Sequence, residues 1–222
     1  FAAGSLWSVS EPACYSRTVN EWACLDYFAD RGSELVEAAQ QHLLITVLSV
    51  LAGLALALPL ALLARRVPRL ETAILGSATA LYAVPSLALL PLLVPFTGLS
   101  MTTVVIGLAL YALTVLVRAF LDGLGSVPAD VVESARGLGH SPGSRLWRIE
   151  LPLALPVVMG GLRVATVSTV ALTTIGALVA HGGLGNLILG GVETAFRAQL
   201  LAASVLCVAI AVLLDVVDDA IQ

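Results

Sequence analysis

The sequence contains no lysine, and all eleven of its basic residues are arginine. A Walker A phosphate-binding loop needs a lysine that reaches the β- and γ-phosphates of the nucleotide. The chain therefore cannot form such a loop, and any ATP chemistry would have to come from another protein. Its net charge of −4 comes without the basic stripe that marks a nucleic-acid-binding surface.

Charged side chains are scarce, at 12% of the 222 residues, whereas an ordinary soluble domain has about 25%. Hydrophobic residues make up 59% of the chain, which leaves too little polar surface to cover a soluble core. A membrane-spanning helix needs about 20 apolar residues. Uncharged runs on that scale are Leu43–Ala64, Thr72–Val117, Val164–Val192 and Ala198–Leu214. The sequence therefore predicts an all-α, polytopic membrane protein.

We predict about five transmembrane helices, because the longest run is divided by the turn signal Pro95-Phe96-Thr97-Gly98. The fourth segment is longer than one span needs, and the prolines at one end and glycines at the other predict turns outside the membrane. The predicted spans are 41–64, 71–94, 101–121, 152–180 and 198–217. They form a transmembrane domain over 41–217, between an N-terminal segment with a lead-in helix (1–40) and a short C-terminal end (218–222).

The arginines predict the orientation of the chain, because loops rich in basic residues remain in the cytoplasm. The loops after the first and third spans hold Arg65, Arg66, Arg69, Arg136, Arg145 and Arg148. The opposite side holds Arg17, Arg31 and Arg197. We therefore expect the N-terminus outside and the C-terminus inside. Arg118 and Arg163 fall within spans near the cytoplasmic edge, where each needs a partner or must reach the interface.

Two cysteines, Cys14 and Cys24, fall in the segment predicted to lie outside, where a disulfide can persist. A redox or metal-binding pair is the alternative, although no further ligands accompany them. Cys207, within the fifth span, reads as an inert packing residue. Ser33 predicts the start of a helix that leads through 34–41 into the first span.

The long polar loop over 122–150 predicts two short helices. Pro128 suits the first turn of one helix, and Gly139 can end it in a left-handed conformation. Ser141 and Pro142 form an N-cap and N1 pair for the second helix. The first helix carries a narrow apolar stripe and is too short to be stable alone in water. We therefore expect it to pack against something. The stripe residues are Val131, Ala135 and Leu138.

This loop resembles the coupling loop of ABC importer permeases, whose pattern is E-A-A, three residues, G, nine residues, I-x-L-P. Matching residues at those spacings are Glu133, Ala135, Gly139, Ile149, Leu151 and Pro152. One position departs from the pattern, since Ser134 stands where the family has alanine. The change replaces one small residue by another.

The resemblance implies a type I ABC importer permease fold in the cell membrane of a prokaryote. It implies that ATP and Mg are bound by separate ABC ATPase subunits, onto which the loop docks. Further implied partners are a second permease, identical or a sister chain, and an extracytoplasmic solute-binding protein. The residues expected to form the ATPase-docking loop are Val131, Glu133, Ser134, Ala135, Arg136, Leu138, Gly139, Ile149, Leu151 and Pro152.

Other segments look like the osmoprotectant-uptake branch of these permeases, which carries glycine betaine, choline or carnitine. The similar segments are Val84–Leu90, Leu110–Arg118, Glu150–Arg163 and Gly182–Ile188. The second of them departs from the branch pattern, because Thr114-Val115-Leu116 replaces a proline-containing stretch. A quaternary-ammonium solute is therefore the expected cargo, with an amino acid or an oxyanion as the alternative.

Several residues are candidates for the translocation path or its gate: Pro85, Ser86, Tyr111, Thr169, Thr173, Gly182, Gly183, Gly185 and Asn186. The threonines could instead hydrogen-bond neighbouring helices, and Pro85 could be a tolerated kink rather than a gating bend. Tyr82 and Tyr111 could stack on a quaternary ammonium group, or they could lie at the membrane interface or serve packing. The glycine-rich run lacks the lysine of a phosphate-binding loop and falls on the predicted outer side. It is therefore interpreted as a turn that allows a short re-entrant segment near the outer gate.

Two other classes of protein fit the sequence less well. An ion-coupled carrier would show inverted repeats and acidic residues in mid-membrane, and no Asp or Glu falls within the middle of a predicted span. An enzyme would need a nucleophile, base and acid together, and we identify no catalytic group. Nor do we expect a metal site, because His42, His140 and His181 are scattered. Asp215, Asp218 and Asp219 read as a solvated helix face.

Overall fold

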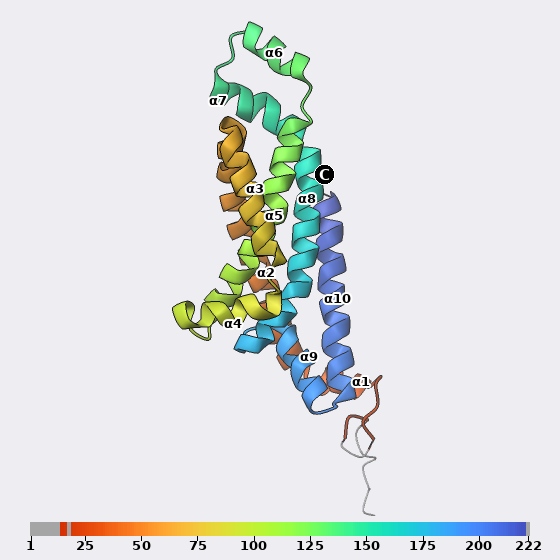
Figure 1. Ribbon diagram of the computed structural model, residues 1–222. Coiled ribbons are helices and arrows are strands. Elements are labelled where there is room, and N and C mark those ends of the chain that lie inside the picture. Colours follow the sequence, from red (N-terminus) through yellow and green to blue (C-terminus); the bar gives the residue numbers. More distant parts are fainter. Residues whose placement is uncertain (1–13, 17–18, 221–222) are drawn as a thin grey trace, which may run out of the picture.

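The computed structural model describes residues 14–16 and 19–220, and every regular element in that part of the chain is a helix (Figure 1). Arg17 lies outside the described residues. In order, the helices are α1 (Leu25–Asp30), α2 (Gly32–Arg66), α3 (Pro68–Ala83), α4 (Ser86–Thr97), α5 (Met101–Gly125), α6 (Ala129–Gly137), α7 (Pro142–Arg145), the π-helix η1 (Leu146–Glu150), α8 (Leu151–Thr173), the 3₁₀ helix η2 (Thr174–Val179), α9 (Leu184–Glu193) and α10 (Arg197–Ala220).

The core of the bundle is the packing of α5 against α2 and α8. Buried alanines of α2 meet Leu116 of α5 and Val158 of α8 in one apolar cluster. Glycines bring the backbones close, since a Cβ on Gly161 would lie 2.2 Å from the Cβ of Ala119. Small residues at such contacts are typical of membrane helices, where van der Waals packing rather than hydrophobic burial drives association.

Four continuous stretches are long and apolar enough to cross a membrane: Gly32–Arg66, Met101–Gly125, Pro142–Val179 and Arg197–Ala220. They correspond to the first, third, fourth and fifth predicted spans. The second predicted span, over 71–94, is divided at the Pro85 kink into α3 and α4, which meet at an angle of 100°. They make a fifth span only if the bent pair is counted as one.

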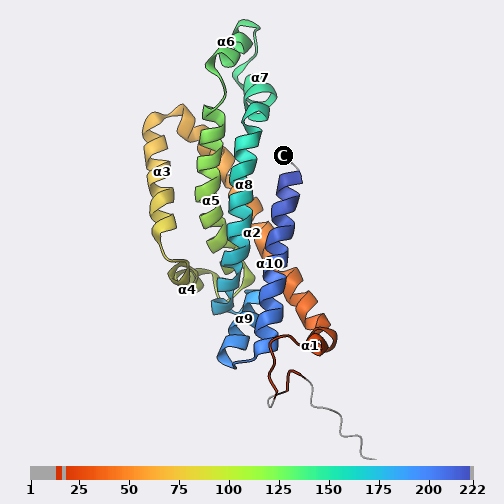
Figure 2. The same ribbon diagram turned by 90° about the vertical axis from the view of Figure 1, so that its right-hand side faces the viewer.

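The break between α3 and α4 follows from Pro85. Proline has no N–H to donate and disfavours helical geometry in the residue before it. Val84 is accordingly extended, with φ −68° and ψ 127°. Beyond the break, α4 lies across the bundle while α3 runs alongside α5 (Figures 1 and 2). The turn expected over 95–98 comes late, because α4 continues to Thr97 and ends at Gly98, whose φ is +74°.

The N-terminal segment is tied to the opposite end of the bundle from α6 (Figure 1). The predicted disulfide between Cys14 and Cys24 is present. Tyr27 packs edge-on against Phe196, at 5.4 Å between ring centroids. The helix start predicted at Ser33 is wrong by a residue or two, because α2 begins at Gly32 with Arg31 as its N-cap.

A hydrogen bond fixes Tyr15 within this N-terminal segment. Its hydroxyl donates to Asp30 at 2.6 Å. The bond to the carboxylate, together with the negative charge, raises the pKa of Tyr15. Tyr15 also lies 5.8 Å from the ring of Tyr27, so the stapled segment and α1 form one aromatic cluster with the start of α10.

The two ends of the described chain lie toward opposite ends of the bundle, with α1 at one end and the last turn of α10 nearer the other (Figures 1 and 2). The loop after α2 and the loop carrying α6 share an end, as the arginine distribution predicts (Figure 1). Which end faces the cytoplasm stays a prediction.

Candidate functional site

The segment between α5 and α8 projects beyond the rest of the bundle and carries α6 at its tip (Figure 1). Pro128 precedes α6 as its N-cap, one residue before the expected first turn. The helix ends at Gly137, and Gly139, two residues later, takes the predicted left-handed conformation with a φ of +82°. There the N–H of Gly139 donates to the carbonyl of Arg136, and that of His140 donates to the carbonyl of Ala135. These two bonds are the Schellman arrangement, which satisfies carbonyls at a helix end.

The second predicted helix of the loop is also present, as α7. The Ser141 hydroxyl accepts a hydrogen bond from the Ser144 N–H at 3.3 Å, and Pro142 is the first helical residue. The chain continues through η1 directly into α8, which begins at Leu151 and Pro152. The motif that matched the coupling loop therefore spans three short helical pieces and the entrance to a long one.

The apolar stripe of α6 faces back toward η1. Val131, Ala135, Leu138 and Ile149 line one shallow cavity of about 270 Å³. Ala135 is buried, whereas Leu138 is 81% exposed. Exposed apolar side chains that form a contiguous patch mark a contact surface for another molecule.

Trp147 is a second exposed apolar side chain of this loop, and it was not among the residues predicted to form the docking loop. It belongs to η1 and is 60% exposed. The signal was present in the sequence, because Trp147 is the one tryptophan in the polar loop over 122–150. Exposed aromatic residues are enriched at the energetic centres of protein interfaces.

The polar residues of the loop turn outward. Glu133, Ser134 and Arg136 are exposed. Glu133 and Arg136 line a groove of about 760 Å³ together with Arg65 of α2. Within the described residues, the side chains of Glu133 and Arg136 form no ion pair, so both charges are available to a partner.

Glu150 joins the loop to the bundle. Its carboxylate is 2% exposed. It accepts a hydrogen bond from Arg65 of α2 and another, at 2.6 Å, from Arg145 of α7. Breaking a buried ion pair is costly because the remaining charges lose their partner in a low-dielectric setting. The loop and the end of α2 are therefore mechanically connected.

The residues expected along the translocation path fall into two groups. The first group lies where α3, α4 and α5 meet. Pro85 and Ser86 form the bend, and the Tyr111 hydroxyl donates to the Val84 carbonyl there. The Tyr111 ring packs edge-on against Tyr82, with centroids 5.8 Å apart.

The second group lies in buried packing between α8, η2 and α2. The hydroxyl of Thr169 donates to the Ala165 carbonyl, and Thr173 lies 3.2 Å from the Thr46 hydroxyl. Both threonines are buried. The Thr173 hydroxyl thus contacts a neighbouring helix, which was the alternative considered above, whereas the Thr169 hydroxyl bonds within α8.

The glycine-rich turn packs against α2. A Cβ on Gly183, whose φ is +56°, would lie 2.6 Å from the backbone nitrogen of His42. One on Gly185 would lie 2.3 Å from the carbonyl oxygen of Thr174, and one on Gly182 would lie 2.4 Å from the Ala177 nitrogen. Glycine is required where backbones approach this closely.

Asn186 and His42 hold the same turn in place. The Asn186 side chain accepts from the Gly182 N–H at 3.0 Å and donates to the Ala180 carbonyl at 3.3 Å. The imidazole of His42 is buried and lies within hydrogen-bonding distance of the carbonyls of Gly182 and Val170. The histidine is thus a packing link between α2, α8 and the turn.

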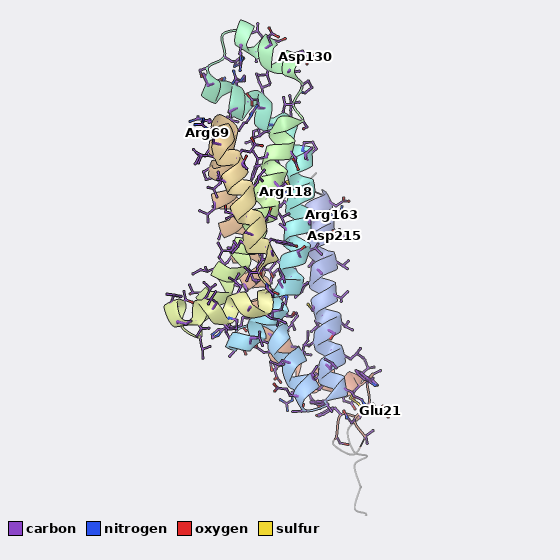
Figure 3. The ribbon with its side chains drawn as sticks, viewed as in Figure 1. Glu21, Arg69, Arg118, Asp130, Arg163 and Asp215 are labelled. Atoms are coloured by element: carbon purple, nitrogen blue, oxygen red, sulfur yellow. A yellow bond between two sulfur atoms is a disulfide. The ribbon has the colours of Figure 1, made fainter. Side chains whose placement is uncertain are left out.

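The prediction that the C-terminal aspartates form a solvated face is wrong, because Asp215 and Asp219 are paired and the Oδ2 atom of Asp218 is buried. Arg163 of α8 pairs with both oxygens of Asp215 in α10, and with Asp219 at 2.8 Å (Figure 3). The expectation that Arg163 needs a partner is confirmed. Asp218 makes no ion pair within the described part of the chain.

Comparison with known proteins agrees with the family resemblance of the loop between α5 and α8. The family model described as "binding-protein-dependent transport system inner membrane component" matches residues 49–222. The chain is 34% identical over 196 residues to the osmoprotectant import permease protein OsmW of Salmonella typhimurium, covering 86% of this chain and 91% of that protein. It is 32% identical over 171 residues to the carnitine transport permease protein OpuCB of Listeria monocytogenes, covering 77% and 78%.

A third relative is the glycine betaine/carnitine/choline transport system permease protein OpuCD of Bacillus subtilis. It is 33% identical over 192 residues, covering 86% of this chain and 84% of the relative. Among solved structures, the chain superposes on one from the MetNI methionine ABC transporter with a TM-score of 0.77 at 21% identity, covering 86% of this chain and 96% of that one. The predicted fold class is thereby confirmed.

Proposed function

The chain belongs to the family of binding-protein-dependent transport system inner membrane components, the permease subunits of ABC importers, and we propose that it carries quaternary-ammonium osmoprotectants inward. Glycine betaine, carnitine and choline are the cargo named for the relatives that match most of its length. The membrane is the plasma membrane of a prokaryote, with the α6 end in the cytoplasm and the N-terminal segment outside.

ATP and Mg bind to partner ATPase subunits, and α6 docks onto them. The observation that carries this proposal is the exposed side chain of Leu138 at the end of α6, on a helix whose exposed Glu133 and Arg136 form no ion pair within the described residues. An apolar centre with a polar rim is the composition of a protein interface. A second permease, identical or a sister chain, completes the path, and a solute-binding protein delivers cargo from outside.

Movement of the docked loop reaches the spans through Glu150. Because this carboxylate is bonded to both Arg65 and Arg145, a displacement of α6 and α7 pulls on the end of α2. It also pulls on α8, since η1 leads into that helix without a break. The two helices that flank α5 therefore move together when the ATPase closes.

The docking role is tested by co-purification of the ATPase subunit with Leu138→Asp. We expect that substitution to reduce recovery of the ATPase at least tenfold while leaving the permease in the membrane, because it places a charge in an apolar contact. The matched control is Leu25→Asp, which changes an equally exposed leucine, 84% exposed, at the other end of the bundle. Undiminished recovery with Leu138→Asp contradicts docking through α6.

The substrate is tested by uptake of labelled glycine betaine into proteoliposomes that contain the complete transporter and its binding protein. Unlabelled choline and carnitine should compete with it, whereas methionine and nitrate should not. Uptake confined to amino acids or oxyanions would overturn the osmoprotectant assignment and leave the permease role intact.

A further inference from the structure

A groove of about 490 Å³ runs between α3, α5 and α8. Its polar lining comes from Thr79 and Tyr82 of α3, and from Thr114, Arg118 and Asp122 of α5. Its floor is open at Gly160 of α8, where a side chain would meet nothing within 4 Å. The groove thus offers space, a cation, an anion and an aromatic ring on one side of the bundle.

Arg118 is the residue of interest in this groove, because most N–H donors of its guanidinium form no hydrogen bond within the described residues. It lies seven residues before the end of α5, or about 10 Å along the helix axis. An arginine has five N–H donors. Among the described residues, its side chain bonds only to the Thr79 hydroxyl, at 3.2 Å, and forms no ion pair.

A charged group inside a membrane span is expensive to expose to lipid and normally faces a polar cavity or a partner. Arg118 is exposed in the isolated chain, and so are Thr79 and Asp122 beside it. Three polar side chains on two helices therefore mark this groove as a surface that faces away from lipid. Its free donors suit a carboxylate, which accepts two parallel bonds from a guanidinium.

Tyr82 supplies the second recognition element. Its side chain is 52% exposed, and its ring is held edge-on to the buried Tyr111. Tyr111 is itself anchored by its bond to the Val84 carbonyl, so the pair is fixed at the bend between α3 and α4. An exposed aromatic face held in this way attracts a quaternary ammonium group.

The spacing of the two elements fits a small zwitterion. Tyr82 follows Thr79, the partner of Arg118, by three residues, which is about 4.5 Å along α3. On α5, Tyr111 and Arg118 are seven residues apart, which is about 10 Å. Tyr82 and Arg118 also line the same groove, so a small molecule held there can contact the ring and the guanidinium together.

We propose that the groove between α3, α5 and α8 is a transient binding site for zwitterionic quaternary ammonium solutes, with Arg118 receiving the carboxylate and Tyr82 the ammonium group. This assignment rests on the proposed function, and it adds a selectivity that the function alone does not require. Solutes that have both groups use both contacts, whereas a quaternary ammonium alcohol such as choline uses only the ring.

The experiment measures uptake of glycine betaine and of choline side by side, in proteoliposomes holding the complete transporter. Arg118→Gln should lower glycine betaine uptake at least tenfold and choline uptake less than threefold, because only the former loses a charge contact. Arg118→Lys should recover most of the glycine betaine uptake. Tyr82→Leu should lower both about tenfold, and Tyr82→Phe, which keeps the ring face, should lower them by less.

The control is Arg31→Gln, which removes an exposed arginine at the other end of the bundle and should leave the ratio of the two uptakes unchanged. The ratio is the decisive readout, because a folding defect lowers both solutes equally. An equal loss of both solutes in Arg118→Gln, or no loss, overturns the groove assignment while wild-type uptake still supports the proposed function. A wild-type transporter that imports neither solute refutes the proposed function and the groove assignment with it.

Discussion

Arg118 and Arg163 both lie within transmembrane helices at a similar height in the bundle, yet their surroundings differ (Figure 3). Arg163 is bonded to both oxygens of Asp215 and to Asp219, which joins α8 to α10. Arg118 has the Thr79 hydroxyl as its only described partner. The same residue type therefore serves packing where its donors are satisfied within the chain, and is available to a ligand where they are not.

Glu150 is the most buried of the charged groups that are paired within the chain. Its removal should have the largest effect on stability among the variants considered. Glu150→Ala leaves Arg65 and Arg145 without their shared carboxylate, and we expect a loss of about 3 kcal/mol in the free energy of unfolding. The thermal midpoint in detergent should fall by several degrees. The exposed Glu133→Ala is the control, and equal midpoints for the two variants would contradict a structural role for the clamp.

Asp215→Asn should have an intermediate effect on stability. It removes the charge that pairs bidentately with Arg163 and leaves only the more exposed Asp219. The thermal midpoint should fall, and transport should fall only in proportion to the folded protein. Asp218→Asn is the matched control on the same helix, because Asp218 makes no ion pair within the described residues. A lower midpoint for the Asp218 variant than for the Asp215 variant would reverse the assignment.

Thr79→Val should have the smallest effect and one of a different kind. The hydroxyl is exposed and its bond to Arg118 holds the guanidinium in place, so the thermal midpoint should not change. The KM for glycine betaine should rise about twofold to threefold, because an unrestrained guanidinium must be ordered when the carboxylate binds. Thr72→Val, on the same helix, is the control. A fall in the thermal midpoint as large as that of Asp215→Asn would show that Arg118 stabilises the fold, as Arg163 does, and would contradict its assignment to ligand binding.

Much of the fold could be predicted from the sequence because the relevant signals are local. Uncharged runs predicted four of the five spans, and the Gly139 and Ser141-Pro142 signals correctly located the helix end and start within the loop between α5 and α8. The bend at Pro85 was predicted only as a kink. Its size depends on α4 packing against α5 and η2, contacts between residues far apart in the sequence.

The residues of the candidate site were harder to judge from the sequence. Thr173 and Gly183 carry the composition of a path or a gate, but contacts with Thr46 and His42 bury them. Arg118 and Tyr82 lie 36 positions apart in the sequence and were considered separately there. The groove they share exists only because α3 and α5 lie side by side.

The sequence by itself determined that this chain spans a membrane, that these 222 residues lack the lysine of a Walker A loop, and that they carry a motif resembling the coupling loop of the family. Those properties depend on composition and short-range spacing, which folding cannot change. The tertiary structure decided which charges are neutralised within the chain and which remain available. The physical reason is that an ion pair requires two groups within a few ångströms, and only the packing of distant helices sets that distance.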